Sequence, residues 1–84
     1  MNVRDTVSEY ISRKFLHERF QTLTIATALF EEGIIDSMAM LDLVKFLEKT
    51  FYITVEDREY IPDYFATIER IELFVQNKLT TKKQ

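Results

Sequence analysis

The sequence contains no cysteine and only one glycine and one proline among its 84 residues. Without cysteine, neither a disulfide nor a thiolate metal site can stabilise the fold, so packing alone must hold it. An all-β domain needs turn residues every eight to twelve positions or so. Because this chain has so few, helices joined by a few longer loops are favoured. The hydrophobic content of 46%, with seven phenylalanines and four tyrosines, is enough for a globular core.

Long hydrophobic runs are missing as well. No apolar segment approaches the roughly 18 residues that a membrane span requires. Residues Met1 to Asp5 are polar and mixed in charge, unlike the apolar centre of a signal peptide. We therefore expect a cytoplasmic protein with no membrane span. A length of 84 residues leaves room for one small domain.

Negative charge dominates the central part of the chain. The formal net charge is only −3, yet residues 31–72 hold eleven acidic and four basic side chains. Because such a surface repels phosphate backbones, we expect no binding to nucleic acid. The same surface favours protein partners that have basic patches, and we expect the chain itself to be a monomer.

A first helix is predicted over residues 3–20. Apolar side chains recur there at steps of three and four, which places them on one helical face: Val3, Val7, Tyr10, Ile11 and Phe15. Asn2 can cap the start of this helix. Basic side chains gather at its end, where the helix dipole favours cations: Arg13, Lys14, His17 and Arg19.

Residues 21–35 show no helical period. The first half is rich in threonine and β-branched residues, and the second half places the apolar pairs Leu29-Phe30 and Ile34-Ile35 on either side of Glu31-Glu32-Gly33. A short edge strand is one interpretation, but the chain offers no second strand to pair with it. We therefore predict a long ordered loop pinned by its apolar pairs. Loops of this length are often functional.

A second helix is predicted over residues 37–51. Its core stripe consists of apolar side chains that lie close together on a helical wheel: Met40, Leu43, Val44, Leu47 and Phe51. Asp36 precedes the stripe as a natural N-cap, which leaves Ser37 in the first turn.

The last third of the chain predicts a loop, a short turn and a third long helix. The loop covers residues 52–59, and Pro62 to Phe65 suit one short turn of helix, since proline is tolerated at a first-turn position. Thr67 can cap the last helix. Its apolar stripe is Ile68, Ile71, Val75 and Leu79.

These elements predict an all-α fold. We expect a small four-helix bundle of three main helices plus one short helix, with a long loop between the first and the second helix. The domain would cover residues 1–79, and residues 80–84 would form a polar, frayed tail.

The residue types give little support for catalysis or metal binding. His17 is the only histidine, and its place near the end of the first helix has a sufficient structural explanation. Glu31-Glu32 and Asp57 to Glu59 could in principle bind a hard cation, but neither run has the ligand spacing of an EF-hand loop. Solvated charge explains both runs better. We predict no catalytic and no metal-binding residue.

The tripeptide Asp36-Ser37-Met38 is the most informative local feature. A serine in the first turn projects its hydroxyl from the N-terminus of a helix, where unpaired backbone N–H groups and the dipole favour an attached phosphate. On the same wheel Met38, Leu41 and Lys45 lie opposite the core stripe. Two apolar residues on an outward face beside this serine predict a docking surface, unless another segment covers them.

These residues resemble the phosphopantetheine attachment motif of acyl and peptidyl carrier proteins. The matching segment reads Leu29-Phe30-Glu31-Glu32-Gly33-Ile34-Ile35-Asp36-Ser37-Met38. The resemblance continues through Leu43, Leu47-Glu48 and Phe51, then Ile53 and Val55, and ends with Ile61-Pro62-Asp63-Tyr64-Phe65 and Thr67-Ile68. It covers roughly residues 3–79, and the ordered set of motifs is more specific than the tripeptide alone.

The resemblance implies a four-helix carrier that is itself not an enzyme. Ser37 would receive the phosphopantetheine arm of coenzyme A from a separate Mg-dependent phosphopantetheinyl transferase. Asp36 would help this transferase to hold its metal ion and would help to orient the serine. The thiol of the arm would carry the cargo as a thioester between an acyl- or aminoacyl-loading ligase and downstream synthase or transferase enzymes. The docking face for these partners would comprise Met38, Leu41, Asp42, Lys45 and Glu48.

The sequence also departs from the family pattern. Met38 stands where leucine is most common, Ile25-Ala26 stand where the loop is usually acidic, and Lys45 and Lys49 dilute a helix face that is strongly acidic in the fatty-acid synthesis carriers. The pattern therefore favours a stand-alone carrier from a specialised biosynthetic pathway, with an acyl or aminoacyl cargo. A fatty-acid synthesis carrier and an unmodified helical interaction module remain as alternatives.

Overall fold

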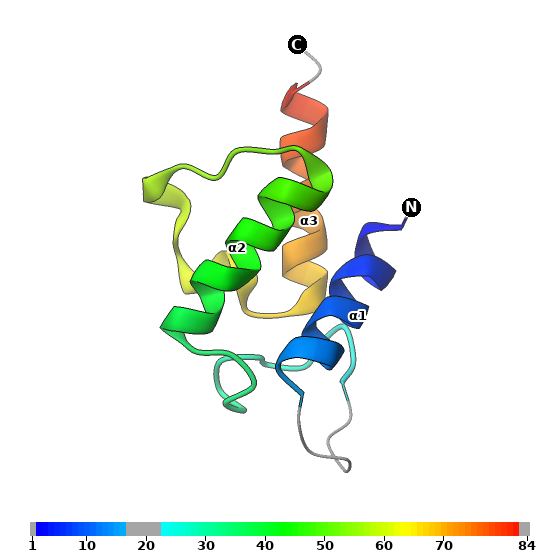
Figure 1. The fold of residues 1–84 in the computed structure, drawn as a ribbon, viewed down its shortest axis with the longest axis vertical. Helices are drawn as coiled ribbons and strands as arrows, with labels where there is room; N and C mark the ends of the chain where they lie inside the picture. The colour runs from blue at the N-terminus through cyan, green and yellow to red at the C-terminus, as the bar shows by residue number, and fades with distance from the viewer. Residues whose placement is uncertain (1, 17–22, 83–84) are drawn as a thin grey trace.

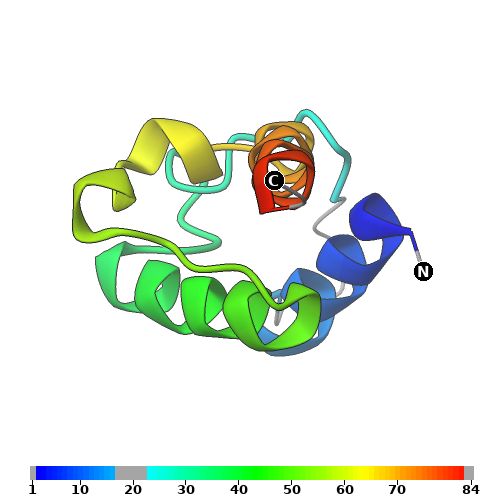
Figure 2. The same ribbon diagram turned by 90° about the horizontal axis from the view of Figure 1, so that it is seen from above.

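The computed structural model describes residues 2–16 and 23–82, and within these residues the fold is all-helical with no strand. Its three α-helices are α1 (Val3–Lys14), α2 (Ser37–Phe51) and α3 (Ile68–Lys82), and two short 3-10 turns, η1 (Asp57–Glu59) and η2 (Pro62–Phe65), lie between α2 and α3. Seen from above, α1 and α2 lie along one side of the molecule, and α3 and η2 lie along the other (Figures 1 and 2).

Helix α1 begins as predicted and ends earlier than predicted. The side chain of Asn2 accepts a hydrogen bond from the backbone N–H of Asp5 at 3.1 Å and so caps the first turn. The backbone N–H groups of Phe15 and Leu16 both donate to the carbonyl of Ile11, at 2.9 and 3.2 Å. Two donors on one carbonyl close the last turn and stop the helix at Lys14. The predicted extension is therefore wrong at residues 15–16, and residues 17–20 lie outside the described part of the chain.

The segment between α1 and α2 is an ordered loop, as predicted, and the edge-strand alternative is wrong for residues 23–36. It is tied to the start of α3 at two points. The Ile25 carbonyl accepts a hydrogen bond from the Glu69 backbone at 3.0 Å, and the Leu29 N–H donates to the Ala66 carbonyl at 2.9 Å. Leu29 and both isoleucines of the pair Ile34-Ile35 are buried in the core, so the apolar pairs do pin the loop.

Helix α2 has the predicted bounds and the predicted buried face. All five residues of its core stripe are buried. The helix ends where Tyr52 takes a left-handed conformation with φ of 57°. A left-handed residue directly after the last turn is a common way to terminate an α-helix.

The short helix predicted at residues 62–65 is a 3-10 turn, so no fourth α-helix joins the bundle in the described residues. The reason is the position at which α3 starts. Thr67 accepts a hydrogen bond from the backbone N–H of Arg70 at 3.1 Å and caps α3, which leaves too few residues after Pro62 for an α-helix. The turn still contributes to the core, because Phe65 is completely buried.

Helix α3 completes the core. Of its predicted stripe, Ile68, Ile71 and Val75 are buried and Leu79 is partly buried. Phe74, which the stripe does not include, is buried too. The helix extends to Lys82, three residues past its predicted end, and residues 83–84 lie outside the described part.

Candidate functional site

Ser37 is the first residue of α2 and is exposed to solvent. One carboxylate oxygen of Asp36 accepts a hydrogen bond from the Ala39 N–H at 2.8 Å, and the Asp36 carbonyl accepts one from the Met40 N–H at 2.8 Å. The backbone N–H groups of Ser37 and Met38 lie in the first turn of α2, where no earlier helical carbonyl can accept a hydrogen bond from them. The predicted cap is therefore confirmed, and the serine stands at a helix terminus that attracts anions.

The loop before Ser37 fixes the point at which α2 starts. The carbonyl of Leu29 accepts hydrogen bonds from the backbone N–H groups of Ile34 and Ile35, at 2.9 and 3.2 Å. Gly33 makes the turn between them with φ of +73°, a conformation that a side chain would strain. Because Ile34 and Ile35 are buried directly before Asp36, the exposed serine follows a firmly anchored segment.

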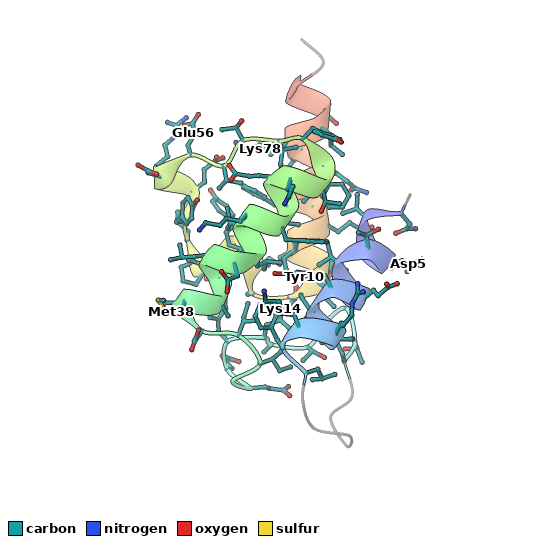
Figure 3. All side chains as sticks on the ribbon, in the orientation of Figure 1. Asp5, Tyr10, Lys14, Met38, Glu56 and Lys78 are labelled. Carbon is teal, nitrogen blue, oxygen red and sulfur yellow. The ribbon has the colours of Figure 1, made fainter. Side chains whose placement is uncertain are left out.

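Met38 and Leu41 are exposed, as the helical wheel predicted. Met38 is 74% exposed and Leu41 is 42% exposed, and Lys45 is exposed on the same side of α2. Figure 3 shows Met38 at the start of α2, on the outer surface of the molecule. No segment of the described chain covers these residues. Together with Asp42 they form an open strip of two apolar and two charged residues next to Ser37, which we call the α2 strip (Met38, Leu41, Asp42 and Lys45).

The two acidic residues expected at the docking face have different environments. Asp42 is exposed within the α2 strip, and its backbone carbonyl accepts a hydrogen bond from the Tyr10 hydroxyl at 3.4 Å. Burial, and then the charge of Asp42, raise the pKa of Tyr10 above its ordinary value. Glu48 is partly buried, and its carboxylate accepts a hydrogen bond from the Val55 N–H at 2.9 Å. Glu48 therefore holds the loop after α2, and Asp42 offers the freer carboxylate.

Sequence reasoning missed the aromatic contact that joins α1 to α2. The rings of Tyr10 and Phe46 are stacked with their centroids 3.8 Å apart, and the Phe15 ring meets Tyr10 edge-on at 5.7 Å. Figure 3 shows Tyr10 on α1, on the side that faces α2. The sequence pattern places Tyr10 on the apolar face of the first helix. The only feature of the sequence that could have indicated Phe46 as the partner of Tyr10 is the position of Phe46 at the edge of the α2 stripe.

Sequence reasoning also missed a groove of about 390 Å³ between α3 and the two 3-10 turns. Its lining is Glu56, Arg58, Glu59, Tyr64, Phe74, Asn77 and Lys78. Lys78 lies 2.6 Å from the carboxylate of Glu59 and 5.7 Å from the centre of the Phe74 ring. The spacing of Phe74, Asn77 and Lys78 along one face of α3 is the only signal in the sequence.

The charged residues of this groove are paired with one another. Burial acts to raise the pKa of the Glu59 carboxyl, but the hydrogen bond from Lys78, the backbone hydrogen bond from Glu56 and two positive charges lower that pKa overall. Glu59 and the N–H of Glu56 form part of a capping box on η1. The groove is thus built from a structural ion pair and aromatic walls, and its charges have structural roles.

No cluster of potential metal ligands is found among residues 2–16 and 23–82. No group of three or more potential His, Cys, Asp or Glu ligands lies close enough together to hold a metal ion there. His17, the one histidine, falls outside these residues. None of the helices in the same residues combines the length and the hydropathy needed to cross a membrane.

Comparison with known proteins identifies relatives across most of the chain. The chain is 36% identical over 67 residues to a Serratia sp. (strain ATCC 39006) protein named "Probable acyl carrier protein PigG". The aligned residues cover 80% of this chain and 77% of the relative. The chain is also 31% identical over 71 residues to the D-alanyl carrier protein of Streptococcus pyogenes serotype M5 (strain Manfredo). This alignment covers 84% of this chain and 87% of the relative.

No model of a protein family matches the sequence. The two kinds of relative nevertheless agree with the motif around Ser37 and with the all-helical fold. This chain therefore belongs to the family of stand-alone acyl and aminoacyl carrier proteins.

Proposed function

We propose that the chain holds a phosphopantetheine arm on Ser37 and shuttles an acyl or aminoacyl thioester between partner enzymes of a specialised biosynthetic pathway. The observation that supports this most is the placement of Ser37, exposed in the first turn of a helix that Asp36 caps. Carrier proteins among the relatives, one of them a D-alanyl carrier, support the same class of cargo.

The residues around Ser37 suit a covalently attached phosphate. In the transfer, Ser37 Oγ forms the new P–O bond to the pantetheine phosphate of coenzyme A, the pyrophosphate bond breaks, and the adenosine bisphosphate half leaves. The hydroxyl proton passes to the transferase. The backbone N–H groups at the start of α2 favour the negative charge that stays on Ser37. When attached, the arm supplies a thiol that forms the thioester with the cargo.

Asp36 is proposed to serve both the helix and the transferase. One of its carboxylate oxygens caps α2, and the side chain is exposed beside Ser37. Carboxylate oxygens are the ligands that Mg²⁺ prefers, so the second oxygen is available to the metal ion of the transferase. Binding there would also orient the neighbouring serine.

Partner enzymes are proposed to dock on the α2 strip. Met38 and Leu41 offer an exposed apolar contact immediately beside Ser37, and apolar patches with polar surroundings are typical of protein–protein contacts. Asp42 and Lys45 would set the orientation of the partner by charge. Glu48 would act at the edge of this face, since its carboxylate holds the Val55 backbone.

The direct test is the intact mass of the protein after incubation with coenzyme A and a promiscuous phosphopantetheinyl transferase. We expect the wild-type protein and Ser12→Ala, a change at an exposed serine on α1, to gain one phosphopantetheine. Ser37→Ala should fold normally and gain none. Modification that persists in Ser37→Ala, or that never occurs in the wild-type protein with several transferases, would leave the unmodified interaction module as the better explanation.

A further inference from the structure

A small hollow of about 230 Å³ lies between the loop before α2 and the turn η2. Its lining residues are Ala28, Phe30, Glu31, Pro62, Asp63 and Ala66. This volume is below the range of about 300–1,000 Å³ that is usual for pockets that bind drug-sized molecules. The hollow therefore suits a small chemical group.

The walls of this hollow are held in place by backbone hydrogen bonds. The Leu29 N–H donates to the Ala66 carbonyl at 2.9 Å and joins the two segments that form the walls. Within the loop, the Glu32 N–H donates to the Ala28 carbonyl at 2.9 Å. Leu29 is completely buried beneath the walls, so the hollow is a fixed feature of the fold.

The chemistry of the lining has two parts. Four of the residues are apolar, and the other two, Glu31 and Asp63, have exposed carboxylates. No lysine or arginine is among the lining residues. Within the described chain neither carboxylate takes part in an ion pair. A group that enters this hollow meets apolar walls and two negative charges that form no ion pair within residues 2–16 and 23–82.

The hollow is connected to Ser37 through the loop before α2. One of its walls is the loop that leads into α2, and buried Ile34 and Ile35 connect that wall to Asp36. Figure 1 shows this loop beneath the start of α2, with the 62–65 turn behind the helix. A flexible arm attached to Ser37 would therefore begin at the end of the loop that forms one wall of the hollow.

We infer that the hollow is a cargo subsite for an aminoacyl group with a small apolar side chain. This inference rests on the proposed attachment of the arm to Ser37. The α-ammonium of the aminoacyl thioester would lie between the Glu31 and Asp63 carboxylates, because charge-assisted hydrogen bonds to carboxylates are stronger than neutral ones. The side chain would lie against Phe30 and Pro62. A simple acyl group of the same size lacks the ammonium and gains only the apolar contact.

The test compares two cargoes that differ mainly in this charge. Holo protein is prepared with an alanyl or a propionyl group on the arm, each through a stable amide in place of the thioester, and backbone amide shifts are recorded by NMR. We expect the alanyl group to shift the amides of Ala28, Phe30 and Ala66 beyond the positions seen with holo and propionyl protein. High salt should reduce this difference, since both carboxylates are exposed.

The double variant Glu31→Gln/Asp63→Asn should remove the difference between the two cargoes. An exposed ion pair changes a binding equilibrium by up to roughly fivefold. The fraction of alanyl groups docked in the hollow should therefore fall by about that factor in the double variant. Glu32→Gln is the matched control, because Glu32 is exposed in the same loop and does not line the hollow.

Two results would overturn the inference: identical shifts with both cargoes, or a difference that survives in the double variant. Failure of the carrier function is separable from both, because the holo protein would then not form at all.

Discussion

Ser37 is exposed because its neighbours take up the local structural work. Asp36 caps the helix with its side chain, and Ile34 and Ile35 anchor the preceding chain in the core. The serine hydroxyl has no part in either role. This division leaves Ser37 free for the proposed modification, while the residues that determine its position remain buried or bonded.

Met38 and Leu41 should matter for partner binding and not for stability. Replacing either with a polar residue should change the free energy of unfolding by no more than about 0.5 kcal/mol, as at an ordinary surface site. Loading of the arm by the partner ligase should fall much further, because these side chains lie beside Ser37 on the open face of α2. Chemical denaturation and a loading assay measure the two effects.

Leu43→Ala is the matched control, since Leu43 is completely buried on the opposite face of α2. It should destabilise the protein by about 2–5 kcal/mol. A loss of around 2 kcal/mol or more from a polar residue at position 38 or 41 would instead place that side chain in the core and contradict the assignment.

At the scale of the elements, polar contacts add to the buried side chains of Ile53, Val55 and Phe65 in holding the region between α2 and α3. Glu48 on α2 accepts from the Val55 N–H, and Glu59 on η1 accepts from both the Glu56 N–H and Lys78 on α3. Figure 3 shows Lys78 on α3 and Glu56 across from it on the outer loop. The turn η1 has no buried side chain, so these bonds supply much of its positioning.

Lys78→Met should loosen this region. The variant removes the positive charge beside Glu59, and at neutral pH it should lower the free energy of unfolding by about 1 kcal/mol, the upper end for a partly exposed ion pair. The Glu59 pKa is lowered in the folded protein. The contribution of Glu59 to the free energy of unfolding is thus fully present above the pKa that Glu59 has in the unfolded chain. It is lost as the pH falls through the pKa of Glu59 in the folded protein.

The difference between the wild-type protein and Lys78→Met should therefore shrink on acidification, as measured by urea denaturation at a series of pH values. Lys49→Met is a control at an exposed lysine that forms no ion pair in the described chain. A difference that stays constant down to acidic pH would show that Lys78 stabilises the fold through its contact with Phe74 alone.

The elements also show which parts of the fold a sequence can predict. The bounds of α2 were predictable because a cap, Asp36, and a regular buried stripe give the same start and the same face. The early end of α1 was not, because apolar Phe15 continues the periodic pattern while its backbone N–H closes the last turn on Ile11. Periodicity reports which side chains face the core and says less about where the backbone leaves the helix.

At the scale of the whole molecule, contacts distant in sequence create what the pattern could not predict. The motif around Ser37 and the outward face of α2 were predictable, since both depend on neighbours along one helix. The hollow between the loop before α2 and η2 depends on the hydrogen bond between Leu29 and Ala66 and on a turn at Pro62 that is not an α-helix. The stack of Tyr10 on Phe46 likewise joins two helices whose spacing no local pattern specifies.

The whole molecule presents two kinds of charge to a partner. Residues 31–72 are acidic overall, but the α2 strip includes Lys45, and Lys49 is exposed further along the same helix. Partners that dock on fatty-acid carriers use basic patches, and these two lysines should repel such a patch. We therefore expect fatty-acid synthesis enzymes to handle this carrier slowly and a ligase of its own pathway to handle it faster.

Replacing Lys45 and Lys49 with glutamate should speed the fatty-acid enzymes, mostly through the association rate, because steering by charge acts before contact. The gain should shrink at high salt as the exposed charges are screened. Lys14→Glu/Arg70→Glu makes the same change in net charge at exposed positions on α1 and α3, and should bring a much smaller gain. If the unaltered protein already competes equally with a fatty-acid carrier, charge on α2 does not select its partners, and the specialised-pathway assignment loses its main physical support.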